Sequence, residues 1–147
     1  MKKGESHAVR LQYGALLYRE TKTAGLEILL VTTRQSKRWI IPKGWPIKGL
    51  SGRNSAARVA YEEAGVRGIA GRKPVGTYVY GKQLNDVMVT VPCEVHVYAL
   101  RVRRREKVWP ESHQREVRWY KPSDAIAAIE ESELRSLVTA VVEVLRK

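Results

Sequence analysis

The sequence predicts a single α/β domain over residues 1–147. Short apolar runs rich in β-branched residues are interleaved with two main helical segments, one near the middle of the chain and one at its end. A chain of 147 residues is the size of one ordinary domain and can bury a sizeable core. The sequence contains no internal repeat and no low-complexity segment that would mark a second domain.

Six runs are predicted as strands because apolar or β-branched residues fill them and turn residues bound them. They span 9–18, 27–33, 39–41, 74–80, 87–102 and 116–120. A turn covers 21–25, and the Pro42-Lys43-Gly44 loop breaks regular structure after the third run. Alternation in the fifth run predicts one apolar face and one row carrying polar groups, which can line a cleft. The apolar positions are Cys93, Val95, Val97 and Ala99, and the row between them is Glu94, His96, Tyr98 and Leu100.

Three helices complete the prediction. The first begins at about Arg53 and stops before Gly65, a residue suited to the left-handed position after a helix. A short helix through Ile129 takes Ser123 as its N-cap. The last begins near Ser132 and carries an apolar stripe at helical spacing, which we interpret as core. The stripe is formed by Leu134, Leu137, Val138, Val141 and Leu145.

The composition favours an anionic partner inside a reducing compartment. Lys and Arg number 27 against 15 Asp and Glu, giving a net charge of +12 that attracts polyanions. Nucleic acid explains this charge as well as a small polyphosphate does, although the aromatic residues do not form the paired stacking motif of a common RNA-binding sheet. Cys93 is the only cysteine, the N-terminal residues lack the apolar run of a secretion signal, and no apolar stretch could span a membrane. We therefore expect a cytoplasmic protein without membrane contact.

The most informative segment is 44–66, GWPIKGLSGRNSAARVAYEEAGV, because its helix carries two adjacent acids. A helix turns about 100° per residue, so Glu62 and Glu63 flank Val59 at about 60° on one side and about 40° on the other. Small residues at Ala56, Ala60 and Ala64 lie around the other side and allow close approach to a sheet. One or two carboxylates together with substrate phosphate oxygens suit Mg²⁺. The alternative is an ordinary solvated pair of glutamates.

This segment resembles the Nudix box, the signature of the Nudix hydrolase family. It matches in register at Gly44, Arg58, Glu62, Glu63 and Gly65, and it departs at two acidic positions, Leu50 and Val59. Segments 38–45, 65–78 and 109–126 look like the subfamily that cleaves diphosphoinositol polyphosphates and dinucleoside polyphosphates. The resemblance implies a Nudix α/β/α sandwich with a mixed, curved β-sheet and Mg²⁺-dependent hydrolysis of a pyrophosphate bond, with Mn²⁺ as a substitute ion.

The resemblance also implies roles for the acids. Glu63 is expected as the main metal ligand and Glu62 as the base or a second ligand. Arg58 lies four residues before Glu62, where an ion pair can orient that carboxylate. An acid outside the box often assists the metal in this family, and Glu94 is the candidate, with a solvent-facing row as the alternative.

Basic residues near the box are the candidate substrate ligands. In the resembled subfamily, groups that hold substrate phosphates precede the box, which points to Arg34, Arg38, Lys43 and Gly44. Arg10 on the first strand lies near a position used similarly. The planar guanidinium of arginine suits phosphate oxygens. The basic run at 101–107 is interpreted instead as a solvated strand end and loop.

The absence of an acid at Val59 lowers the rate of hydrolysis that we expect. Losing a metal ligand or base typically costs about two to four orders of magnitude in rate, whereas the first box acid, replaced by Leu50, often does not touch the metal in this family. Three functions stay open: a slow pyrophosphohydrolase acting on a nucleoside or inositol polyphosphate, a catalytically impaired protein that binds such a ligand, and a basic nucleic-acid-binding domain.

Overall fold

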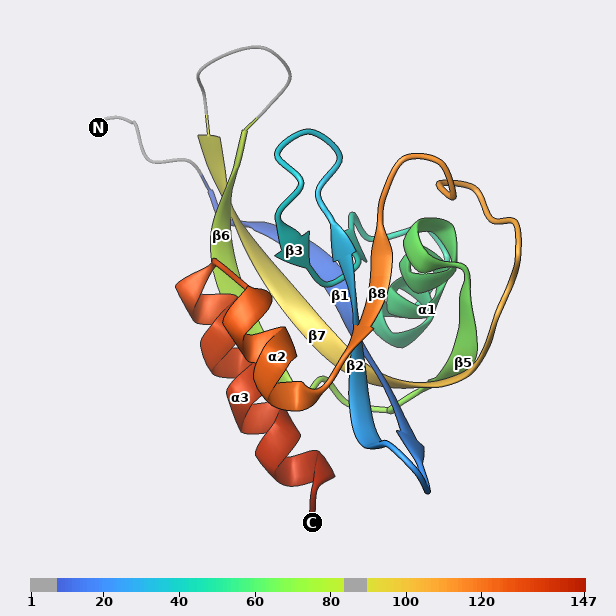
Figure 1. Cartoon of the computed structure of the whole chain (residues 1–147). Coiled ribbons are helices and arrows are strands. Elements are labelled where there is room, and N and C mark those ends of the chain that lie inside the picture. Colours follow the sequence, from blue (N-terminus) through green and yellow to red (C-terminus); the bar gives the residue numbers. More distant parts are fainter. Residues whose placement is uncertain (1–7, 84–89) are drawn as a thin grey trace.

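A mixed, curved sheet with helices on both faces forms the protein, as a computed structural model of residues 8–83 and 90–147 shows (Figure 1). The strands are β1 (Arg10–Thr21), β2 (Gly25–Thr32), β3 (Trp39–Ile40), β4 (Lys43–Gly44), β5 (Val66–Ala70), β6 (Gly76–Gln83), β7 (Thr90–Arg105) and β8 (Val117–Tyr120). The helices are α1 (Gly52–Ala64), α2 (Pro122–Ala128) and α3 (Ser132–Leu145). The α/β/α architecture predicted from the sequence is confirmed.

Strand β1 is the centre of the sheet. It pairs antiparallel with β2 and parallel with β7, and the sheet continues through β3 and β8 on one side and through β5 and β6 on the other. Strands covered on both faces are continuous apolar runs rather than alternating ones. Residues 15–17 and 28–31 are accordingly 0% exposed.

Helix α1 packs on the face of the sheet opposite α2 and α3 (Figure 1). Ser51 caps its first turn by accepting a hydrogen bond from the Asn54 amide at 3.1 Å. Gly65 ends it in the left-handed conformation at φ 70°, as predicted. The small residues Ala56, Ala60 and Ala64 are 0% exposed. The stripe of small side chains therefore seats the helix on the sheet and leaves its other face free for chemistry.

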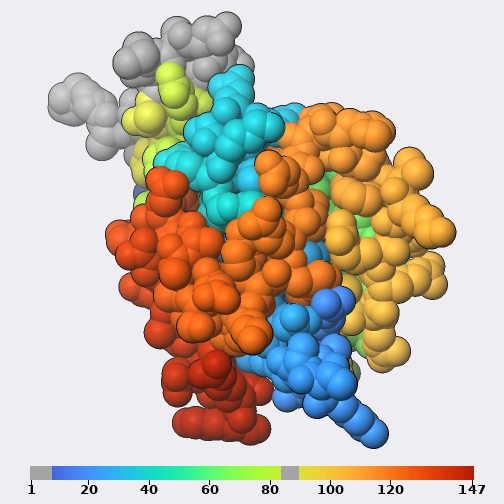
Figure 2. Space-filling view, viewed as in Figure 1, coloured from blue at the N-terminus to red at the C-terminus, as the bar shows by residue number. Residues whose placement is uncertain are grey.

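Helices α2 and α3 cover the second face (Figure 2). The predicted apolar stripe of α3 is core: Leu134, Leu137, Val138 and Val141 are buried, and Leu145 packs against them. Ser123 is not the N-cap of the short helix. The N-cap is Lys121, two residues earlier, and it makes no side-chain cap bond; the helix begins at Pro122 because proline suits the first helical turn. Among the described residues, no helix is long and apolar enough to cross a bilayer.

The sheet also corrects two sequence predictions. On β7, the predicted alternation holds through Val97 and then inverts, so that Tyr98 is buried and Ala99 is partly exposed. The reason is α1, which covers the second face there; Tyr98 lies against Gly52 at its start. Strands β4 and β5 were not predicted. The first three residues of the predicted run 87–102 lie outside the described residues.

Candidate active site

A cavity of about 470 Å³ opens where α1 faces β4, the β4–α1 loop and the long segment between β7 and β8. Its walls combine acidic, basic and aromatic side chains. They include Gln12, Thr33, Arg34, Ile40, Lys43, Gly44, Trp45, Pro46, Ile47, Val59, Glu62, Glu63, Tyr80, Lys82, Glu111 and Arg115. A polar, mixed-charge cavity of this size can hold a charged small molecule.

One face of α1 forms the floor of this cavity. Glu62 and Glu63 both line it, with Val59 between them, as the helical spacing predicts. Val59 is 6% exposed and packs on the backbone of Gly44, where an added Cβ would come within 3.2 Å of its Cγ2. The glycine of β4 therefore lets the loop approach the helix at the position where the family motif has an acid.

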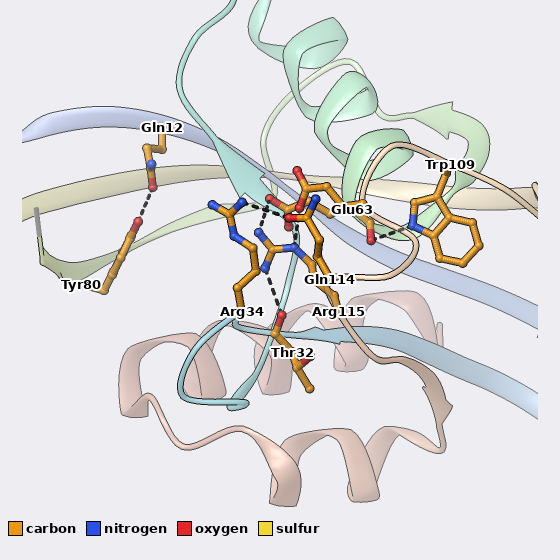
Figure 3. A network of polar contacts seen from close by, with 9 residues as sticks. Gln12, Thr32, Arg34, Glu63, Tyr80, Trp109, Gln114 and Arg115 are labelled. Atoms are coloured by element: carbon orange, nitrogen blue, oxygen red, sulfur yellow. Dashed lines mark hydrogen bonds and ion pairs between the residues drawn. The ribbon is translucent and has the colours of Figure 1, made fainter. Parts of the chain in front are cut away.

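Glu63 is the most buried acid of the site, at 6% exposure. Its Oε2 lies 3.5 Å from Nη2 of Arg115, and its backbone carbonyl accepts a hydrogen bond from the Trp109 indole at 3.2 Å (Figure 3). Within residues 8–83 and 90–147, no group donates to its buried Oε1. Burial raises the pKa of Glu63 to about 7, although the cations of Arg115 and Lys43 oppose that rise. One carboxylate oxygen is thus paired, and the other is buried without a hydrogen-bond partner among the described residues.

Arg115 is held in place by three acceptors. Its Nε pairs with Glu111 Oε1 at 2.7 Å, its Nη1 donates to the Thr32 carbonyl at 3.0 Å, and its Nη2 faces Glu63 (Figure 3). The side chain is only 9% exposed. The segment that carries it is anchored to the end of α1, because the Glu111 amide donates to the Glu62 carbonyl at 3.0 Å. Arg115 is therefore a fixed, buried cation.

Lys43 supplies a second cation beside Glu63. Burial lowers the pKa of its ammonium, while the carboxylates of Glu63 and Glu131 raise it. Its Nζ lies 4.6 Å from the centre of the Tyr80 ring. The Tyr80 hydroxyl donates to Gln12 Oε1 at 2.6 Å, and burial raises the pKa of this hydroxyl, so it stays protonated (Figure 3). The hydrogen bond to Gln12 thereby fixes the ring beside which the ammonium lies.

The cavity brings together five of the predicted site residues, namely Glu62, Glu63, Arg34, Lys43 and Gly44. Arg34 reaches it from the turn after β2 and donates from Nη1 to Gln114 Oε1 at 3.1 Å (Figure 3).

Four other predicted residues do not line the cavity. Arg10 is exposed at the start of β1, and Arg38 is turned to its own loop, where Nε donates to the Ser36 hydroxyl at 3.2 Å. Arg58 is exposed, and among the described residues no ion pair joins it to Glu62. Glu94 lies 3.4 Å from His96 and is 45% exposed, which agrees with a solvent-facing row.

The sequence prediction missed several wall residues, notably Gln12, Tyr80, Glu111 and Arg115. Gln12 had a usable signal, since it is a polar residue in a mostly apolar predicted strand, and the structure buries it at 2% exposure. Glu111 and Arg115 are an acid and a base four residues apart, a spacing that indicates an ion pair in a helix but carries no such meaning in an irregular segment.

The site offers a divalent metal ion one or two carboxylate ligands, which is the smallest number that proteins use. Among the described residues, no group of three His, Cys, Asp or Glu side chains is arranged to hold an ion. The unpaired Oε1 of Glu63, with Glu62 beside it on the helix, nevertheless supplies the one or two carboxylates that Mg²⁺ takes when substrate phosphates and water complete its shell.

Comparison with solved structures shows the same fold in other proteins. Two structures of a C. elegans Ap4A hydrolase, one of them a binary complex, superpose with TM-scores of 0.67 and 0.69 at 20% and 19% identity. Each match covers 94% of this chain, with 99% and 98% of the other chain. At such low identity these matches show the fold alone.

Sequence comparison extends the likeness. Nudix hydrolase 13, mitochondrial, of Arabidopsis thaliana is 29% identical over 105 residues, which are 69% of this chain and 52% of that protein. Human diphosphoinositol polyphosphate phosphohydrolase 3-beta is 32% identical over 107 residues, covering 71% and 60%. The chain thus spans about half the length of the first curated relatives it matches. The NUDIX domain model matches residues 9–140, and the chain therefore belongs to the NUDIX domain family, whose hydrolases generally use divalent metal ions.

Proposed function

We propose that this chain hydrolyses a pyrophosphate bond in a nucleoside or inositol polyphosphate, slowly and with Mg²⁺, or with Mn²⁺ in its place. The observation that carries the proposal is the buried oxygen of Glu63, which has no hydrogen-bond partner among the described residues, at a cavity that Arg34 and Lys43 also line. A metal-facing carboxylate beside phosphate-binding cations is the combination that this reaction needs. The bound ion would neutralise charge that develops on the phosphate oxygens.

Each side chain then has a distinct task. Lys43 and Arg34, which both line the cavity with Glu63, bind phosphate oxygens, Lys43 as a compact charge and Arg34 as a planar fork. Glu63 would hold the metal ion through its carboxylate. Glu62 is less buried than Glu63 and takes the proton of the attacking water. Val59 contributes no ligand, so the reaction is expected to be slow.

A second function is supported by the same floor of the cavity. Val59 is apolar, and Arg115 already pairs with Glu63, so the site has kept its cations while losing acidic groups. This favours a protein that binds a polyphosphate without efficient turnover. Nucleic-acid binding rests only on the net charge of +12, and a salt titration tests it because phosphate-driven binding falls steeply with salt. A cytoplasmic location stays a prediction, since three of the Arabidopsis thaliana relatives are named mitochondrial and one chloroplastic.

The test is a screen of dinucleoside polyphosphates, nucleotide sugars, nucleoside triphosphates and diphosphoinositol polyphosphates with Mg²⁺ and with Mn²⁺. We expect turnover of one class and a loss of about two to four orders of magnitude in Glu63→Gln. Glu94→Gln is the matched control, because it removes an exposed carboxylate outside the cavity. Undiminished turnover in Glu63→Gln would refute the assignment. No turnover of any compound, with tight binding of one, would favour the binding function.

A further inference from the structure

Arg115 contacts two carboxylates of the cavity, those of Glu63 and Glu111. The guanidinium touches Glu111 at 2.7 Å and Glu63 at 3.5 Å, and these two acids are close enough for Glu111 to raise the pKa of Glu63. The third acceptor, the Thr32 carbonyl, fixes the orientation of the group. Arg115 is therefore placed as a permanent counter-ion of this acid pair.

The charge of the cavity adds to this effect. Four basic side chains line it, Arg34, Lys43, Lys82 and Arg115, against three acidic ones, Glu62, Glu63 and Glu111. A free divalent cation entering the cavity meets a surface that is already positive. The same positive surface attracts a polyanion. The negative charge of the polyanion also offsets the repulsion between the basic side chains and a metal ion that accompanies it.

One carboxylate oxygen of the site does not pair with Arg115. Glu63 Oε1 is buried and has no partner among the described residues, so it can coordinate an ion that other groups have already stabilised. We propose that Arg115 prevents the site from binding a divalent cation on its own, so that the metal ion enters only together with the polyphosphate ligand. This inference deepens the proposed function and rests on it for the identity of that ligand.

The test follows protein-bound Mn²⁺ by water proton relaxation, which distinguishes it from free Mn²⁺ and requires no turnover. With the wild-type chain, Mn²⁺ alone should give no enhancement, whereas Mn²⁺ with a methylene-bridged ATP analogue should give one. In Arg115→Met the freed acid pair should bind Mn²⁺ alone at least about tenfold more tightly than wild type, because a unit charge a few ångströms away contributes more than that factor. Arg72→Met, at an exposed position between β5 and β6 outside the cavity, should behave like wild type.

If Arg115→Met does not fold, Mn²⁺ binding to the wild-type chain with and without the ATP analogue still tests the inference. Saturable binding of Mn²⁺ alone to the wild-type chain, as tight as in the presence of the analogue, would overturn the inference. A further variant, Arg115→Lys, keeps the charge and should keep Mn²⁺ out; tight Mn²⁺ binding there would also count against it. Absence of turnover on every substrate in the screen, with this Mn²⁺ pattern intact, would remove the hydrolase proposal and leave the role of Arg115 standing.

Discussion

Replacement of Glu63 by glutamine should stabilise the fold at pH 8 and leave its stability almost unchanged at pH 4. The Glu63 side chain is 7% exposed, and burial raises its pKa from 4.5 to about 7. A raised pKa means that the folded protein holds this proton more tightly than the unfolded chain does. Stability from this group is therefore full below pH 4.5 and falls as the pH rises towards 7.

The size of the effect follows from the two pKa values. A rise from 4.5 to about 7 corresponds to about 3 kcal/mol of unfavourable free energy for the ionised form in the folded state. Glutamine has nearly the same shape and never ionises, so it avoids this cost. The variant should match wild type at pH 4 and exceed it by up to about 3 kcal/mol above pH 7.

Urea denaturation of wild type and Glu63→Gln at pH 4, 5, 6, 7 and 8 measures this difference directly, because other titrating groups cancel between the two proteins. Glu94→Gln serves as the control and should track wild type at every pH, since Glu94 is 45% exposed. A difference that does not change with pH, or a wild-type chain that becomes the more stable one at pH 8, would refute the reasoning.

Two further substitutions test the floor and the end of α1. Val59→Glu should raise Mg²⁺-dependent phosphate release by about two to four orders of magnitude. Val59→Gln is the uncharged control. A rate equal to wild type in both variants would show that the helix does not need an acid at this position. Gly65→Ala should lower the free energy of unfolding in urea by about 1–3 kcal/mol more than Gly25→Ala does. Both glycines have φ 70°, but only at Gly65 would the added Cβ meet a neighbour, the Trp109 ring at 2.7 Å, so equal losses would exclude this contact as the cause.

Most strands and the geometry of α1 could be predicted because they depend on local periodicity. The positions of Glu62, Glu63 and Val59 on one helix face follow from the residue spacing alone, and the cavity lining confirms them. Strand β5 lacks such a pattern. Its pairing with β7 shifts register between Arg67 and Gly68, and a bulge of this kind breaks the alternation by which a strand is predicted.

The basic residues show a different limit. Arg34 and Arg38 lie in the same turn, and residue type does not say which one points into the cavity. The turn decides it: the Arg38 amide donates to the Thr33 hydroxyl at 2.9 Å, and Lys37 takes a left-handed conformation at φ 57°. Arg38 is thereby held against its own loop and Arg34 faces the site. Arg115 lay beyond prediction for a related reason, because its place depends on contacts with Thr32, Glu63 and Glu111 across the fold.

Val59 and Arg115 act on the same physical quantity, the charge that the cavity presents to a cation. An acid at position 59 would add a negative charge between Glu62 and Glu63, whereas Arg115 places a positive one against Glu63. Both features weaken the hold on a metal ion, and neither removes Lys43 or the other cations that attract phosphate. Binding of a polyanion and chemistry on it therefore depend on separable parts of the site, and a chain with this cavity can keep the first while the second becomes slow.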